Sequence, residues 1–124
     1  CVVPHDLLRF AEMVRNFGTV GTRQIVPEDW IAEFRSFDDT GPWRRQQDGP
    51  RHFPQGSYRS KWYRTGLPDG EFAAIGIHGQ WIWVNPTREV TIIRMASNDL
   101  PIDPDAGPVL HAAFDAVCRA FAPA

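Results

Sequence analysis

Three β-type runs follow one another with very short links in the second half of this 124-residue chain, at residues 72–78, 81–85 and 90–96. Residues 79–80 link the first two runs, and residues 86–89 link the second and third. Parallel neighbours need a crossover of about a dozen residues or more. Links this short only permit antiparallel pairing, so the sequence predicts an antiparallel meander.

A further run at residues 58–63 precedes the meander and is followed by a turn at Pro68, Asp69 and Gly70. Residues 81–84 and the pair Ile92-Ile93 are apolar on both sides of the chain. That pattern is typical of strands in a sheet that is covered on both faces. We therefore expect a meander of three to four strands with helices packed against it.

Three segments have the apolar periodicity of helices, at residues 6–17, 27–37 and 108–121. Gly18 suits the end of the first helix. Pro27 and the acidic Glu28 suit the start of the second. The predicted fold is α/β of the α+β type, with the meander flanked by N-terminal and C-terminal helices over residues 1–124. Residues 38–57 lack a core pattern, and we expect a long loop there, of the kind that is often functional.

Charge and composition exclude several classes of function. The net charge is −2 and no basic run stands out, so we expect no nucleic-acid partner. No apolar run approaches the roughly 18 residues of a membrane span. The histidines have no metal-ligand spacing with one another or with cysteines, and we expect neither a metal nor a cofactor. These histidines are His5, His52, His78 and His111.

The order of several motifs carries a resemblance. Phe-Ala-Ala-Ile-Gly-Ile-His-Gly-Gln at residues 72–80 is followed by Trp-Ile-Trp-Val-Asn-Pro at 81–86 and Val-Thr-Ile-Ile-Arg at 90–94. Gly-Thr-Arg-Gln-Ile-Val-Pro-Glu-Asp-Trp stands upstream at 21–30. This order resembles the C-terminal third of the class C β-lactamase-like serine hydrolases, in the branch of 6-aminohexanoate-dimer hydrolases and related esterases. The resemblance extends from about residue 7 to residue 121 and implies a β-lactamase/transpeptidase-like fold.

The resemblance implies acyl-transfer chemistry on an amide or an ester. In such enzymes a serine attacks the carbonyl, a lysine three residues later helps to deprotonate it, and two backbone N–H groups hold the oxyanion. One N–H belongs to the serine and the other to a strand that bears a third motif, commonly Lys-Thr-Gly. His78, Gly79 and Gln80 stand at that place here, so the implied cleft comprises these residues and Trp81, with the amide of Gln80 or Trp81 as the oxyanion donor.

Two of these residues have a specific reason for their type. A glycine at position 79 lets a substrate carbonyl approach the strand backbone closely. His78 stands in place of the lysine that meets a carboxylate in penicillin binders, which favours an esterase or an amidase. The plainer interpretation is that the stretch is a strand end and a turn with a solvated His78.

The nucleophile motif is missing from the sequence. No serine is followed three residues later by lysine, because Lys61 is the single lysine and directly follows Ser60. Tyr58-Arg59-Ser60 matches a Tyr-x-Ser motif only superficially, since it lies just before the third motif on an expected core strand. The sequence therefore supplies no catalytic residue, and we expect no activity from this chain alone.

Three hypotheses remain open at this point. The chain is the C-terminal part of a bacterial serine hydrolase, a stand-alone module that binds a small molecule or a partner, or a piece that assists catalysis in trans. Under the first, its partners are an amide or ester substrate and the missing N-terminal portion, or another copy, paired through strand 90–96. The compartment, cytoplasm or periplasm, depends on the sequence that precedes Cys1.

Overall fold

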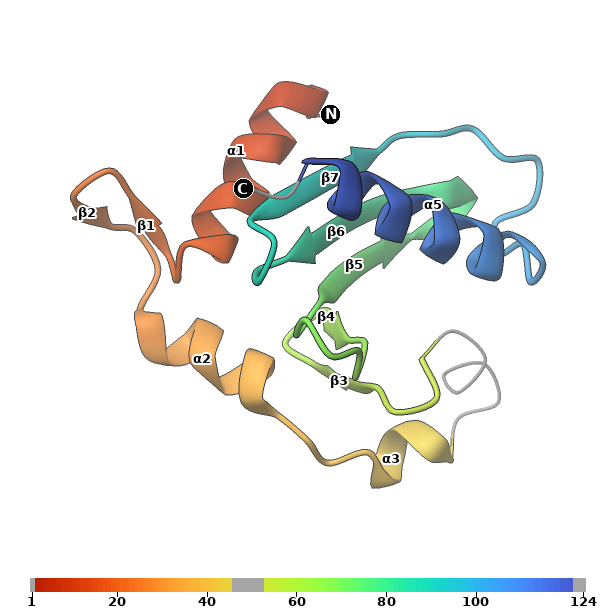
Figure 1. Cartoon of the computed structure of the whole chain (residues 1–124), viewed down its shortest axis with the longest axis horizontal. Helices are drawn as coiled ribbons and strands as arrows, with labels where there is room; N and C mark the ends of the chain where they lie inside the picture. The colour runs from red at the N-terminus through yellow and green to blue at the C-terminus, as the bar shows by residue number, and fades with distance from the viewer. Residues whose placement is uncertain (1, 46–52, 122–124) are drawn as a thin grey trace.

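The computed structural model describes residues 2–45 and 53–121 (Figure 1). The elements are α1 (Pro4–Arg15), β1 (Thr19–Val20), β2 (Arg23–Gln24), α2 (Glu28–Ser36), α3 (Gly41–Arg44), β3 (Ser57–Arg59), β4 (Trp62–Arg64), β5 (Phe72–Gly76), a 3₁₀ turn (Ile77–Gly79), β6 (Gln80–Asn85), β7 (Val90–Arg94) and α5 (Ala106–Phe121). No helix among these residues is long and apolar enough to cross a membrane.

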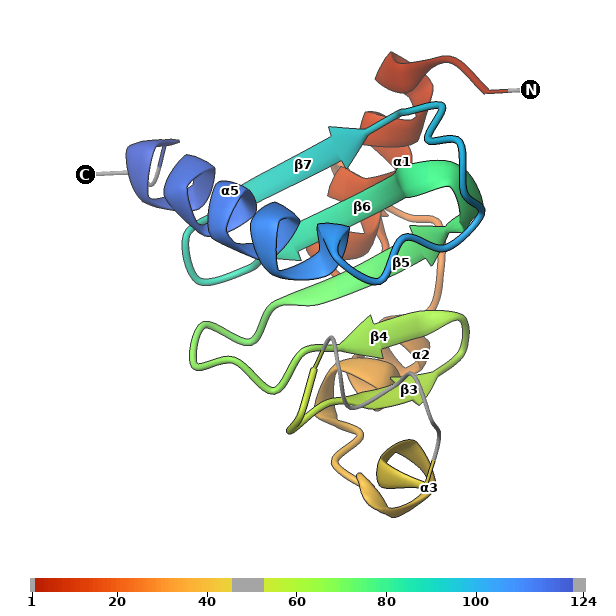
Figure 2. The same cartoon turned by 90° about the vertical axis from the view of Figure 1, so that its right-hand side faces the viewer.

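The central layer is a five-stranded antiparallel sheet in the order β3-β4-β5-β6-β7. Figure 2 shows α5 in front of this sheet, while α1 and α2 lie behind it. The small β1–β2 hairpin forms a separate sheet between α1 and α2. The predicted α+β arrangement, an antiparallel meander flanked by N-terminal and C-terminal helices, is confirmed.

Alternation along the strands divides the core into two halves. On one face Phe72, Ile82 and Val84 pack with side chains of α1 and α2 such as Val14 and Phe34. On the other face the core contains Ala73, Trp81, Trp83, Phe114 and Cys118, the last two from α5. The sheet is therefore apolar on both sides, as the runs at 81–84 and 92–93 predicted.

The predicted single strand at 58–63 is wrong, because this segment is a hairpin. Ser60 and Lys61 have φ angles of 54° and 72° and reverse the chain between β3 and β4. A two-residue turn with positive φ at both positions matches the twist of the strands, but it usually contains Asn or Gly. Ser-Lys lacks that signal, and the sheet thus has five strands where three to four were expected.

The boundaries of other elements also differ from prediction. The expected loop at 38–57 contains α3, which has Pro42 in its first turn, and ends where Ser57 enters β3; residues 46–52 of it lie outside the described part. The expected strand at 72–78 stops at Gly76 because the chain turns there, and the one at 90–96 stops at Arg94. The helices begin and end within two residues of their predicted bounds.

A buried polar cluster joins the turn before β5 to the β6–β7 hairpin. The Asn85 amide donates to Asp69 Oδ2 and to Glu71 Oε1, both at 3.1 Å. Arg88 donates to Asp69 at 2.6 Å. The second oxygen of Glu71, Oε2, is buried and has no hydrogen-bond partner among the described residues. Burial raises the pKa of Glu71, and the nearby Asp69 and Asp115 carboxylates add to this effect.

This cluster predicts the effect of Glu71→Gln. The folded protein holds the Glu71 proton more tightly than the unfolded chain, so folding stability falls as pH rises above the ordinary glutamate range. Glutamine keeps the acceptor for Asn85 and removes the buried charge. We expect Glu71→Gln to raise the melting temperature by a few degrees at neutral pH and to flatten this decline. Thermal denaturation at several pH values measures it, with the exposed Glu89→Gln as control; an unchanged decline would contradict the assignment.

Candidate functional site

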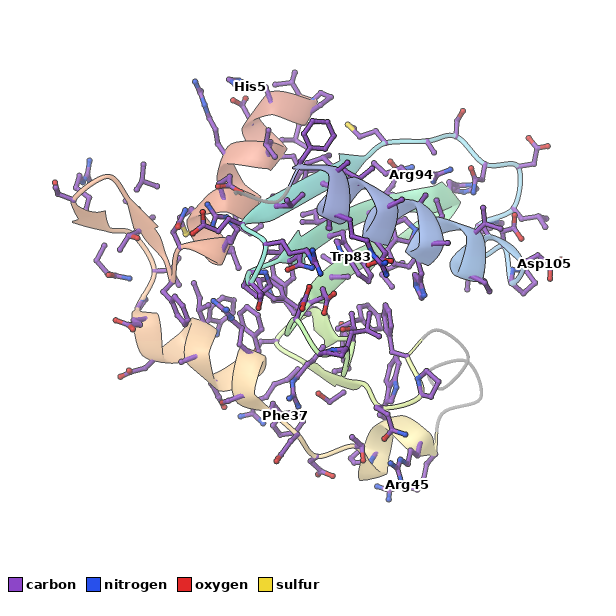
Figure 3. All side chains as sticks on the ribbon, viewed as in Figure 1. His5, Phe37, Arg45, Trp83, Arg94 and Asp105 are labelled. Atoms are coloured by element: carbon purple, nitrogen blue, oxygen red, sulfur yellow. The ribbon has the colours of Figure 1, made fainter. Side chains whose placement is uncertain are left out.

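A cavity of about 260 Å³ lies where β5 ends, β6 begins and α5 starts. The side chains that line it come from α3, β4, β5, β6, the segment after β7 and the first turns of α5. Its residues include Trp43, Tyr63, Ile75, Gly76, Ile77, Gly79, Trp81, Asn98, Ile102, Asp103 and Leu110. In Figure 3 the labelled Arg94 and Asp105 mark the end of the molecule where β7 finishes and α5 begins.

The turn between β5 and β6 forms one rim of this cavity. Gly76 pairs with Gln80 across the turn. Within it, His78 and Gly79 have φ angles of 56° and 83°, both in the left-handed region. The His78 N–H donates to the Pro101 carbonyl at 2.9 Å, and the Asn98 N–H donates to the His78 carbonyl at 3.2 Å. The turn is thus tied to the segment after β7.

Arg94 and Asn98 close around Gly79. The Arg94 guanidinium donates to the Gly79 carbonyl and, at 3.4 Å, to Asn98 Oδ1. A Cβ atom on residue 79 would lie 2.3 Å from Arg94 Nη1 and 2.7 Å from Asn98 Nδ2. The left-handed backbone conformation therefore favours glycine here, and an added Cβ would displace the ends of the Arg94 and Asn98 side chains.

The four residues expected to form the cleft have different roles. Gly79 and Trp81 line the cavity, whereas His78 and Gln80 are not among its lining residues. His78 Nδ1 lies 2.8 Å from the Asn98 carbonyl. The Gln80 side chain donates to the Ala96 carbonyl and accepts from the Ala96 N–H at 3.2 Å. These two side chains therefore fasten the turn to the segment after β7.

Sequence reasoning missed the cavity residues contributed by other elements. Trp43 lies on the short α3, inside the stretch expected to be a loop, and Tyr63 lies on the unrecognised strand β4. Ile102 and Leu110 come from the linker and from α5. The aromatic character of Trp43 within a polar stretch was the one available signal. Burial raises the pKa of the Tyr63 hydroxyl, and the adjacent Tyr58 adds to this, so Tyr63 stays neutral at physiological pH.

Backbone directions at the site follow from one hydrogen bond. The Thr65 N–H donates to the Glu71 carbonyl at 3.1 Å, so Glu71 directs its backbone groups toward β4. Successive residues of a strand direct their backbone groups to opposite sides. Those of Ala73 and Ile75 therefore also point toward β4, while those of Gly76 point toward β6. By the same alternation, the amides of Gln80 and Trp81 point into the sheet, toward the paired residues Gly76 and Arg94 respectively.

The end of β5 is open on its β4 side. The ladder between β4 and β5 ends at the pair Tyr63–Ala73. Ile75 and Ile77 lie beyond that pair, and both line the cavity. The side chain of Ile77 is 63% exposed. A strand edge with free backbone groups beside a cavity is able to bind a substrate carbonyl through its N–H groups.

Metal chemistry has no visible support in this region. Among residues 2–45 and 53–121, no group of three or more His, Cys, Asp or Glu side chains is arranged to hold a metal ion.

The fold has a counterpart among solved structures. The chain superposes with a TM-score of 0.75 and 21% identity on a solved Bacillus anthracis protein that bears the name of a 6-aminohexanoate-dimer hydrolase. This match covers 92% of the chain and 28% of that protein. The chain therefore has the fold of the matched part of that protein, as the motif order predicted.

Similarity in sequence points to the same hydrolases. The 6-aminohexanoate-dimer hydrolase of Paenarthrobacter ureafaciens is 28% identical over 92 residues, which are 74% of this chain and 23% of that enzyme. No family model matches the chain. The resemblance to 6-aminohexanoate-dimer hydrolases is thus confirmed, and the chain spans about a quarter of the length of these two relatives.

The packing around Gly79 predicts the effect of Gly79→Ala. Gly21 provides a matched control, because its φ is 58° but no atom lies within 4 Å of an added Cβ. Gly21→Ala should lose about 1–2 kcal/mol of unfolding free energy from backbone strain. We expect Gly79→Ala to lose about 0.5–1.5 kcal/mol more, because the ends of the Arg94 and Asn98 side chains must move and the Arg94 hydrogen bond to the Gly79 carbonyl is weakened. Urea denaturation of both variants measures the difference, and equal losses would contradict the contact.

Proposed function

We propose that this chain forms one wall of the substrate cleft of a serine hydrolase that cuts an amide or an ester through an acyl-enzyme, and that it has no activity alone. One observation carries the proposal. The strand that leads into the third-motif position, β5, has an open edge on its β4 side, and this edge lies at a cavity. The sequence has no Ser-x-x-Lys motif, so under this proposal the nucleophile belongs to another part of the enzyme. The chain would contribute an oxyanion donor and not the attacking group.

The backbone directions favour Ile77 as this donor. The amides of Gln80 and Trp81, which the motif order suggested, point into the sheet toward paired residues. Ile77 follows Ile75 along the open edge, and its exposed side chain leaves the backbone accessible. An oxyanion donor must point at the carbonyl oxygen from a fixed position. The contacts of Arg94 and Asn98 with the turn support such a fixed position.

A chimera tests this role. The matched region of the Paenarthrobacter hydrolase is replaced by this chain, and hydrolysis of p-nitrophenyl acetate is measured. We expect activity that disappears when the nucleophilic serine of that enzyme is replaced by alanine. Ile77→Pro removes the N–H, and Gly76 (φ −112°, ψ 165°) already has the backbone shape that precedes a proline. Loss of one oxyanion donor should lower kcat by about 100-fold or more.

Ile77→Val is the matched control, because it keeps the N–H and changes only an exposed side chain. Circular dichroism confirms that each variant is folded. A chimera in which Ile77→Pro is as active as Ile77→Val would show that Ile77 is not the donor. A folded chimera without serine-dependent hydrolysis would contradict the proposed function itself.

The outer edge of β7 is proposed to pair with the rest of the hydrolase. Within the described residues β7 pairs with β6 only. Ile92 and Ile93 lie on opposite faces of β7 and are only half-buried. The one charged residue of this strand is Arg94, at its end. Natural edge strands are usually protected by charges, bulges or covering elements. The outer side of α5 is also apolar and exposed at Val109, Val117 and Phe121. About three quarters of each relative lies outside the match and is available to cover these surfaces.

Hydrogen exchange tests this edge residue by residue. The register directs the amides of Ile92 and Arg94 toward β6 and those of Thr91 and Ile93 outward. In the chain alone we expect fast exchange at Thr91 and Ile93 and slow exchange at Ile92 and Arg94. In the chimera Thr91 and Ile93 should exchange at least about tenfold more slowly. Protection in the isolated chain that grows with protein concentration would indicate pairing with a second copy and contradict the assignment.

A further inference from the structure

The walls of the cavity are mostly hydrocarbon. Indole and phenol rings from α3, β4 and β6 line it together with aliphatic side chains from β5, the linker and α5. These residues are Trp43, Tyr63, Trp81, Ile75, Ile102 and Leu110. Gly76 and Gly79 widen it further, because they add no side chain at the rim. A ligand that enters here meets apolar surface on most sides.

Three polar side chains around the cavity make hydrogen bonds within the protein. The Trp43 indole N–H donates to the Phe53 carbonyl at 2.7 Å. Asn98 Oδ1 accepts from Arg94 at 3.4 Å. Asp103 Oδ1 accepts the Asp105 N–H at 3.0 Å. A ligand would have to break such contacts to gain a hydrogen bond from these atoms, which costs much of what the new bond contributes.

Among the described residues that line the cavity, Asp103 alone carries a formal charge. Its carboxylate completes a turn three residues before Ala106, the first residue of α5. The N-terminus of a helix carries a partial positive charge that stabilises a nearby carboxylate. The Asp103 carboxylate thus already has a hydrogen-bond partner within the protein and lies near the start of α5.

We propose that this cavity binds an uncharged, apolar group of the substrate, of the size of a substituted benzene ring, and discriminates against ammonium and carboxylate groups. An apolar cavity of about 150 Å³ accepts benzene, so a volume of about 260 Å³ accommodates a somewhat larger group. The inference rests on the proposed function, because it names the part of the substrate that lies beside the carbonyl held at Ile77. Substrates with a bulky neutral acyl or alkyl group next to the scissile bond are selected.

The 124-residue chain itself is sufficient for the test, because binding in the cavity needs no nucleophile. Three probes share one ring and differ in charge: methyl benzoate, benzoate and benzylammonium. Affinity is measured by NMR titration, following the indole N–H signals of Trp43 and Trp81. We expect methyl benzoate to bind at least about tenfold more tightly than either charged probe. Equal or tighter binding of a charged probe overturns the inference.

Two pairs of variants show whether the probe occupies this cavity. Ala106→Phe introduces a ring at the cavity wall, and Ala112→Phe makes the same change on the exposed side of α5. Ile102→Asn makes the rim polar at a residue that is 67% exposed, so the fold tolerates it, and Leu100→Asn, 58% exposed, is its control. The two cavity variants should weaken methyl benzoate binding by about tenfold, and the two controls should leave it unchanged. Equal affinity of a cavity variant and its control places the probe elsewhere and overturns the inference.

The outcomes separate this inference from the proposed function. Neutral-probe binding that responds to Ala106→Phe, together with an inactive chimera, supports the cavity and contradicts the hydrolase role. An active chimera with no probe binding supports the hydrolase role and overturns the apolar cavity.

Discussion

The arrangement of the whole chain depends on β6, whose residues from Trp81 to Asn85 are buried. This strand pairs with β5 on one side and β7 on the other, and its two faces pack against different helices. A strand without a polar face is stable only between two layers. The positions of α1 and α5 follow from this requirement. The cavity lies at the N-terminal end of the same strand, where the buried Trp81 lines it.

The geometry of the site depends on contacts between segments distant in sequence. His78 and Gly79 occupy left-handed conformations one after the other, which costs about 1–2 kcal/mol for a non-glycine residue such as His78. Arg94 at the end of β7 and Asn98 in the segment after it hold this turn. The side chains of His78 and Gln80, expected to meet substrate, instead fasten the same turn. They serve the site by fixing the backbone of the turn and do not line the cavity themselves.

Much of the fold could be predicted from local patterns. Short links required antiparallel strands, and two-sided apolar runs required helices on both faces. The β3–β4 hairpin was missed because Ser60 and Lys61 adopt a turn conformation that neither residue favours. α3 was missed because its four residues are too few for periodicity. Motif order predicted Gly79 and Trp81 in the cleft, and both line the cavity, but the direction of a backbone amide depends on strand register, which no motif encodes.

The hairpin tip has a practical consequence. Lys61 is the only lysine of the chain, and it is exposed at the turn between β3 and β4. Those strands form the edge of the sheet opposite β7. Apart from the α-amino group, a reagent that couples to amines would therefore attach at one position, which orients the molecules held through it. Immobilised in this way, the chain would present its unpaired strand to the solution and leave the cavity rim chemically unmodified.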